Sequence, residues 1–185
     1  MNLLNRYLLL FTLFNFFILS SCSSSKSKAT PEQLNKLTEL VNEKQFEIVS
    51  DMAYPQVSSA MVSLQNSGLM LPGSNVSQIN LIGNVNYLRI VGDSIYAELP
   101  YFGERQMNAG YNGSDSSISI ENVLQNYSIE ESEKDDSYII SFDAKTQREL
   151  LRFNITIFPN LNTDIFLNGP TRTPIRFTGK AVELD

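Results

Sequence analysis

The fold class is decided by residues 87–99, which read YLRIVGDSIYAEL. Apolar and polar residues alternate on both sides of Gly92-Asp93, and a period of two is typical of strands with one buried face. A glycine-aspartate pair between two such runs indicates a two-residue hairpin turn. We therefore predict antiparallel strands over residues 87–91 and 94–99, joined by a tight turn.

Similar short patterns occur along most of the chain, separated by turn residues. Tyr54-Pro55 ends the first of them, because proline cannot donate to a strand ladder. Many short strands with tight turns are typical of antiparallel sandwiches and barrels. We predict one mainly β (α+β) domain over residues 30–185, an antiparallel β-sandwich or barrel-like sheet with one N-terminal helix packed on it. The further predicted strands are residues 46–52, 77–82, 117–123, 127–131, 137–144, 148–158, 165–167 and 175–182.

The predicted helix begins after Thr30 and runs to about Lys44. Thr30 is a good N-cap, Pro31 suits the first helical position, and Gln33 completes a capping box. One face of this segment is apolar at helical spacing, so we expect it to pack on the sheet. The residues of that face are Leu34, Leu37, Leu40 and Val41.

Residues 58–76 are apolar but broken by Gly68 and Pro72-Gly73, and we predict strand fragments around a long loop there. Such a loop would either pack down on the domain or cover a pocket, and packing is the expected outcome.

The N-terminus has the order of a secretory signal, with one basic residue, Arg6, an apolar run and then small residues. The apolar run is shorter than the roughly 20 residues that span a bilayer. Leu19-Ser20-Ser21-Cys22 resembles a lipobox, in which the thiol carries the lipid and small residues precede the cleavage point. We predict a signal peptide over residues 1–21 and lipidation of Cys22. The alternatives are an uncleaved anchor and an ordinary secretory signal with a chance cysteine.

Residues 22–29 then form a serine-rich tether. Acyl chains on Cys22 would hold the protein on a membrane, at about 0.8 kcal/mol per buried methylene. Ser23 follows the cysteine where an aspartate would favour retention in the inner membrane, so we expect an outer-membrane protein that faces the periplasm. Surface exposure is an open alternative.

The composition of the chain argues against several classes of function. The chain has 14 basic and 20 acidic residues, and removing Arg6 with the signal leaves 13 − 20 = −7, which gives no electrostatic footprint for nucleic acid. There is no histidine, and the only cysteine is Cys22. The usual general base, zinc ligand and activated nucleophiles are therefore missing. We expect no enzyme activity, no cofactor and no metal site.

The run Leu99-Pro100-Tyr101-Phe102-Gly103 resembles the domain of unknown function 4251 family, small lipoproteins of Gram-negative bacteria. The resemblance implies a helix packed on an antiparallel sheet, no established activity and no accepted catalytic residues. Residues 58–76 depart from it, being longer and more apolar than in the family. Weaker matches are Phe46, Tyr54-Pro55, Gly92-Asp93, Tyr111, Gly113, Tyr127, Tyr138-Ile139-Ile140-Ser141-Phe142 and Ile175-Arg176-Phe177-Thr178-Gly179.

The same run supplies the candidate binding residues Tyr101, Phe102 and Gly103, with Tyr111 downstream. Aromatic side chains offer a large contact area at small entropic cost, so these rings could line a ligand groove. The structural alternative is a strand end whose aromatics pack over one mouth of the barrel. A second feature, the acidic residues from Glu130 to Asp136, is interpreted as a solvated strand edge and turn, since it lacks the spacing of a calcium loop.

The predicted function is a membrane-tethered, non-enzymatic module that binds an unknown protein or a small hydrophobic ligand. The alternative is a periplasmic carrier of lipid or another hydrophobic ligand, with a half-barrel fold and residues 58–76 accepting acyl chains. A carrier requires a large apolar cavity, and a filled interior would count against it.

Overall fold

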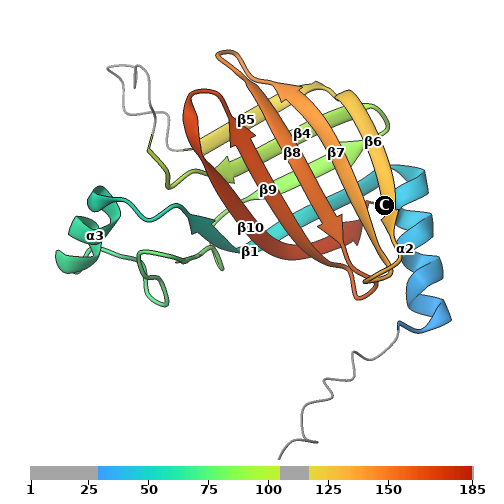
Figure 1. The fold of residues 1–185 in the computed structure, drawn as a ribbon, viewed down its shortest axis with the longest axis horizontal. Coiled ribbons are helices and arrows are strands. Elements are labelled where there is room, and N and C mark those ends of the chain that lie inside the picture. The colour runs from blue at the N-terminus through green and yellow to red at the C-terminus, as the bar shows by residue number, and fades with distance from the viewer. Residues whose placement is uncertain (1–28, 105–116, 185) are drawn as a thin grey trace, which may run out of the picture.

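In the computed structural model, residues 29–104 and 117–184 are described. Nine antiparallel strands form one curled half-barrel sheet in the order β5-β4-β3-β1-β10-β9-β8-β7-β6, and a short strand, β2, pairs with β1 (Figure 1). The barrel-like alternative predicted from the sequence is therefore confirmed. The nine strands are β1 (Gln45–Pro55), β3 (Tyr87–Val91), β4 (Ser94–Pro100), β5 (Ser117–Val123), β6 (Gln125–Ser132), β7 (Ser137–Lys145), β8 (Leu150–Ile157), β9 (Asn162–Gly169) and β10 (Arg172–Glu183).

The hairpin that was predicted first forms as expected. Val91 pairs with Ser94, and the turn between them has Gly92 at φ 59°, which glycine adopts without strain. Asp93 at this turn accepts a hydrogen bond through its carbonyl oxygen from the Leu124 N–H (2.8 Å). Leu124 separates β5 from β6, so this bond fixes the corner at which the chain passes from one edge of the sheet to the other.

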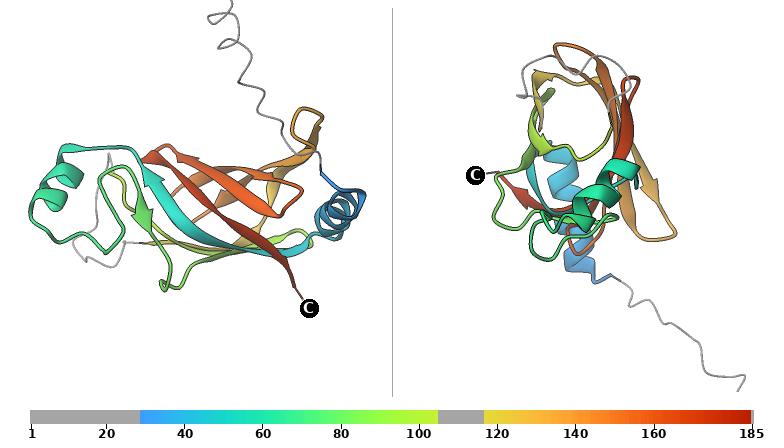
Figure 2. Two further views of the ribbon diagram at one scale, coloured as in Figure 1. Left: turned by 90° about the horizontal axis from the view of Figure 1, so that it is seen from below. Right: turned by 90° about the vertical axis from the view of Figure 1, so that its left-hand side faces the viewer.

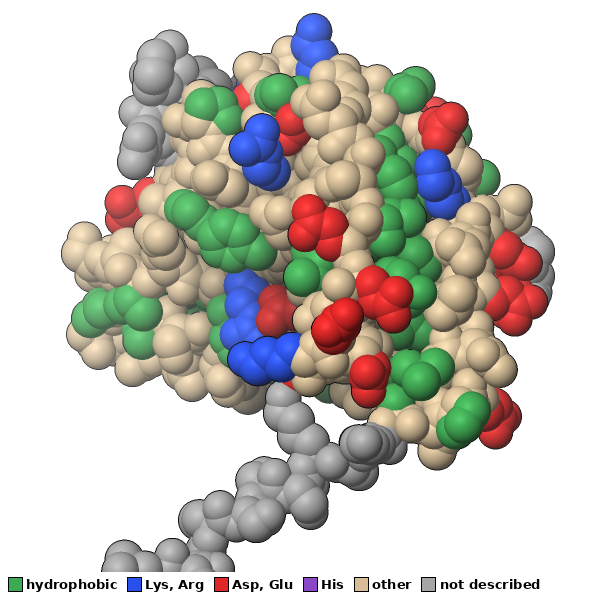
Figure 3. All heavy atoms as spheres, turned by 45° about the vertical axis from the view of Figure 1, so that its right-hand side comes forward, with side chains coloured by type: hydrophobic (Ala, Val, Ile, Leu, Met, Phe, Trp, Pro, Cys, Tyr) green, Lys and Arg blue, Asp and Glu red, His purple; other side chains and the backbone are tan. Residues whose placement is uncertain are grey.

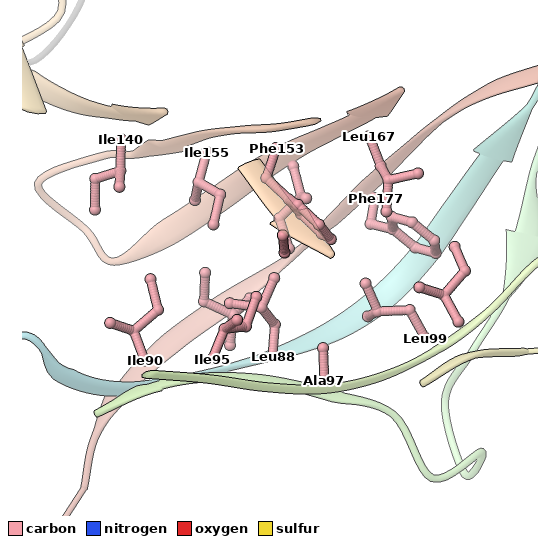
Figure 4. Close-up of a cluster of buried hydrophobic side chains, with 14 of the residues drawn as sticks. Leu88, Ile90, Ile95, Ala97, Leu99, Ile140, Phe153, Ile155, Leu167 and Phe177 are labelled. Carbon is pink, nitrogen blue, oxygen red and sulfur yellow. The ribbon is translucent and has the colours of Figure 1, made fainter. Parts of the chain in front are cut away.

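The inner face of the curled sheet forms the core. Apolar side chains of β3 and β4 lie opposite those of β8, β9 and β10 (Figure 4), and the rings of Phe142 and Phe153 stack at 5.0 Å between centroids. Each fully buried Leu, Ile or Phe stabilises the fold by about 1.5–3 kcal/mol. The core residues with no exposed surface include Ile48, Leu88, Ile90, Ile95, Leu99, Phe153, Ile155, Ile165, Leu167 and Phe177.

Helix α2 (Pro31–Glu43) lies across one end of the half-barrel (Figure 2). Thr30 caps it as predicted, and the Thr30 N–H donates to Gln33 Oε1 (2.9 Å) to complete the capping box. Leu37, Leu40 and Val41 are buried, while Leu34 is only half-buried. The apolar stripe therefore closes this end of the core.

A bulge in β1 explains why residue 179 of β10 is a glycine. The register shifts between Ser50 and Met52, and the Asn86 side chain bonds the Ser50 N–H (2.8 Å) and carbonyl oxygen (3.0 Å) where β3 has not yet begun. Gly179 pairs with Ser50 on the other side, and a Cβ there would lie 2.6 Å from Ser50 Cα and overlap the Val49 carbonyl. Only glycine fits at this position.

The prediction for residues 58–76 was wrong. Helix α3 (Ser59–Asn66) forms in place of strand fragments, capped by Ser58, whose hydroxyl accepts from the Met61 N–H (3.4 Å). Met61 is the one residue of α3 that is buried. We call residues 56–86 the arm: its first part, with α3, extends beyond the end of the half-barrel opposite α2 (Figure 2), and residues 79–86 return along β1.

The strand predicted over residues 77–82 shrinks to β2 (Ile79–Asn80). Asparagine side chains bond the local backbone on both sides of it and compete with ladder formation. Asn75 Oδ1 accepts from the Ser77 N–H (2.9 Å), and Asn80 Oδ1 accepts from the Ile82 N–H (2.9 Å). These turns leave two residues to pair with β1.

Candidate functional site

The run that supplied the candidate binding residues ends β4 at the mouth of the half-barrel. The Tyr101 side chain is 7% exposed, so little of its ring can contact a ligand. Its hydroxyl bonds the Glu104 carbonyl (3.1 Å), the Thr173 carbonyl (2.9 Å) and Thr173 Oγ1 (3.0 Å). Tyr101 thus ties the end of β4 to the start of β10.

Gly103 is needed for space, not for an unusual backbone conformation. Its φ lies outside the left-handed region, and a Cβ there would lie 2.5 Å from Thr173 Oγ1 and overlap the Tyr101 hydroxyl. Phe102 packs, partly buried, against the core. Tyr111 lies outside the described residues. The three candidate residues that are described therefore serve one structural junction.

A buried ion pair lies beside Tyr101, and no pattern in the sequence predicted it. Glu149 and Arg172 are 3% and 7% exposed, and Arg172 Nε donates to Glu149 Oε1 (2.7 Å). The Arg172 guanidinium also lies 4.8 Å from the centre of the Tyr101 ring. Glu149 and Arg172 are far apart in the sequence. They form an ion pair because β10 returns beside the turn into β8, and no local sequence pattern encodes that contact.

The electrostatics of this pair favour the charged state. Burial alone would raise the pKa of Glu149, but hydrogen bonds from Thr171 (2.7 Å) and Arg172 outweigh burial and lower the pKa below its usual value. Arg172 Nη1 is buried and makes no hydrogen bond. The geometry is that of a buried clamp at the mouth of the half-barrel.

The middle of the half-barrel is filled. Residues such as Leu88, Phe153 and Phe177 have no exposed surface at all. Since exposed surface is defined by contact with a water-sized sphere, no space large enough for water adjoins them. The ring of strands seen from the α3 end (Figure 2) therefore encloses packed side chains.

An open groove lies on the outside of the sheet, with a volume of about 1070 Å³. Its sides come from the start of α2, the β6–β7 turn and the β8–β9 turn, and its floor comes from β1, β9 and β10. Acidic and basic side chains are interspersed on the face drawn in Figure 3. The charged groups that line the groove are Asp51, Glu133, Lys134, Asp135, Asp136, Asp164 and Arg176.

An ion pair fixes part of the floor of this groove. Arg176 Nε donates to both carboxylate oxygens of Asp164 (2.7 and 2.8 Å), and the pKa of Arg176 is raised, mainly by this bond. The guanidinium lies 5.2 Å from the centre of the Tyr54 ring. Five acidic and two basic residues line the groove, so its charge is net negative.

The groove was not predicted from the sequence, although the acidic stretch that forms one side of it was noted. The acidic stretch was interpreted as a solvated edge and turn, and Glu130 and Glu131 do lie exposed on edge strand β6. The turn after them forms one side of the groove, which no local pattern indicates. Among the described residues, no group of three or more acidic side chains is placed to hold a metal ion.

Two other side chains with a shifted pKa, Asp143 and Tyr127, each contact a basic residue. The pKa of Asp143 is lowered, chiefly by its hydrogen bond from Arg152 (2.9 Å). Burial raises the pKa of Tyr127 to about 12, and the ammonium of Lys44 lies 4.3 Å from the centre of its ring. Neither group lines the groove.

The predicted signal peptide and lipobox, with Leu19, Ser20, Ser21 and Cys22, lie outside the described residues. In the described ranges, both helices fall short of the length and apolar character needed to cross a membrane.

Comparison with known proteins agrees with the fold. A crystal structure of a DUF4251 family protein from Bacteroides eggerthii DSM 20697 superposes with a TM-score of 0.55 at 9% identity, covering 82% of this chain and 88% of that chain. No curated protein matches. The model of the domain of unknown function DUF4251 matches residues 28–181. Because this match spans most of the sequence, the chain belongs to the DUF4251 family.

Proposed function

We propose that the protein is a lipid-anchored envelope protein that acts as a non-enzymatic binding module, and that its ligand site is the groove on the outside of the half-barrel. The observation that carries this proposal is the contrast between the filled interior and the open groove. Side chains from both turns and from three strands converge on that groove. Ligand sites are concave and present a few convergent polar groups.

The groove chemistry favours a polar ligand that carries positive charge. Its acidic residues outnumber its basic ones, and Arg176 is already paired with Asp164. Charge complementarity then disfavours anionic ligands. The filled core weighs against the hydrophobic-carrier alternative, because an acyl chain would have to displace residues such as Phe153.

The location of the groove also suits a tethered protein. Ala29, the last residue of the predicted tether, lines the groove, so the groove would lie on the membrane-facing side of the domain. An extended tether spans at most about 3.3–3.6 Å per residue, so the short tether of residues 22–29 would keep the groove close to the membrane.

Native mass spectrometry tests the proposal on the chain from Ala29 onward, purified gently from its own envelope. We expect an extra mass on the wild type that is lost in Asp164→Asn and Asp51→Asn. The mass should remain in Glu131→Gln, since this exposed acid lies outside the groove. A clean apo mass for the wild type, or the same extra mass on every variant, would contradict the proposal.

A further inference from the structure

The arm, residues 56–86, differs from the rest of the chain in its charge. It contains no Asp, Glu, Lys or Arg, although 18% of the whole chain is charged. It also exposes large apolar side chains, among them Leu69 (74%), Ile82 (75%) and Val85 (85%). The sequence prediction that residues 58–76 pack down on the domain is wrong for Leu69.

Leu69 lies in the part of the arm that projects from the body of the domain, whereas Ile82 and Val85 lie where the arm returns beside Asp51 and Ser50 of β1. Met61, Ile79 and Leu81 anchor the arm in the core, and α3 lies beyond the end of the sheet (Figures 1 and 2). Val62 and Leu64 are exposed on α3 itself. These two side chains lie on nearly opposite sides of α3, so the helix exposes apolar groups around its circumference, between exposed serine, glutamine and asparagine side chains.

A membrane surface is a poor match for this arm. Segments that lie in the bilayer interface carry Lys or Arg on their polar face and aromatic anchors. Residues 56–86 contain no basic residue and no Phe, Tyr or Trp. Exposed apolar groups gathered on one segment mark contacts with other molecules, and without basic residues or aromatic anchors a protein partner fits this segment better than a bilayer.

We propose that the arm is the interface between two copies of this chain, packed arm against arm about a two-fold axis. A two-fold interface places the same patch on both sides, so any net charge in it opposes itself. In a domain with a formal charge of −7 outside the signal, a charge-free arm lets two copies meet without that repulsion. The arm also has about the length that one partner contributes to a standard interface, roughly 20–30 residues.

The interface is placed so that anchored copies can reach each other. The arm lies at the end of the domain opposite α2, which follows the predicted tether. Confinement to one membrane would raise the effective concentration of the copies. This inference does not rest on the groove, so the two proposals stand or fall separately.

The first test is disulfide crosslinking of the full-length chain in intact envelopes. Leu69→Cys adds one thiol to a chain whose only cysteine is the predicted lipid carrier Cys22. Under mild oxidation we expect an adduct of twice the chain mass. Glu131→Cys, exposed on β6 and far from the arm, is the matched control and should give little adduct. A Leu69→Cys adduct no stronger than the control, or one with a different protein, would overturn the proposal.

The second test is sedimentation of the mature chain carrying Cys22→Ser, over a concentration series. We expect a reversible dimer, and Leu69→Asp with Val85→Asp should weaken it at least about 100-fold, because buried carboxylates would lack partners. Both sites are exposed in the single copy, so the melting temperature should match that of the wild type at concentrations too low for either protein to associate. Equal dimerisation of this variant, a wild type that stays monomeric, or binding to lipid vesicles that the variant loses would refute the arm as a dimer interface.

Discussion

At the residue scale, close approaches and one buried ion pair hold the half-barrel mouth and the β1 bulge together. Gly179 and Gly103 are required because a Cβ at either position would overlap neighbouring atoms. Glu149 and Arg172 are charged, paired and nearly inaccessible to solvent. A buried pair adds little net stability, but removing one member leaves an uncompensated buried charge.

Glu149→Gln should therefore destabilise the domain by about 3–5 kcal/mol at pH 7, since Arg172 would stay buried without its counter-charge. Urea unfolding measures this loss. The exposed Glu131→Gln is the control, and it should change the free energy of unfolding by less than about 0.5 kcal/mol. Equal effects for the two substitutions would show that the buried pair has no special role.

The pH dependence of the free energy of unfolding provides a second test of the Glu149–Arg172 pair. The pKa of Glu149 is lowered in the folded state, so its stabilisation is fully present above the unfolded-state pKa of about 4.3 and is lost as pH falls through the folded-state pKa. The stability difference between wild type and Glu149→Gln should therefore shrink from pH 7 towards pH 3. Asp143, whose pKa is also lowered, is present in both proteins and cancels. A difference that stays constant with pH would contradict this explanation.

At the scale of elements, α2 closes the core while α3 leaves most of its surface exposed. Both helices have a side-chain N-cap, but α2 buries Leu37, Leu40 and Val41, whereas α3 buries only Met61. Short helices gain most of their stability from packing. The two helices should therefore differ in how strongly they are coupled to the sheet.

Leu37→Ala should destabilise the domain by about 2–5 kcal/mol, because it leaves a cavity where a side chain with no exposed surface now packs. The urea midpoint should fall without a change in slope. Lys36→Ala, exposed on the adjacent position of the same helix, should stay within about 0.5 kcal/mol of wild type. If Leu37→Ala were as mild, α2 would not be part of the cooperative core.

At the scale of the whole molecule, α2, which follows the predicted tether, and the α3 end of the arm lie at opposite ends of the half-barrel (Figure 2). The proposed anchor on Cys22 would place the groove beside the tether and direct the arm away from it. Binding near the anchor and self-association at the far end would then not compete for the same surface.

The anchor is tested by metabolic labelling with a palmitate analogue. We expect the full-length chain to be labelled and to partition into detergent, and Cys22→Ser to lose the label and stay uncleaved, because no other residue offers a thiol. Ser25→Ala, three positions downstream, should be labelled like wild type. Label that persists on Cys22→Ser would exclude lipidation at this cysteine.

The sequence by itself determined the features that neighbouring residues encode. The strands around Gly92 and the capped helix after Thr30 were predicted almost to the residue, because strand alternation and capping boxes depend on side chains a few positions apart. The prediction failed at residues 58–76, where apolar residues without clear periodicity fit helix, strand and loop alike. It also fell short at residues 77–82, where asparagine side chains bond the local backbone.

Only the tertiary structure decided what depends on contacts between distant segments. The pairing of β1 with β10 curls the sheet into a half-barrel, and the same return of the chain brings Arg172 to Glu149 and to the Tyr101 ring. The groove likewise forms from two turns and three strands that meet only in the folded chain. Local periodicity shows which face of a strand is buried, but not which strand it meets, because register and pairing are set by packing across the whole sheet.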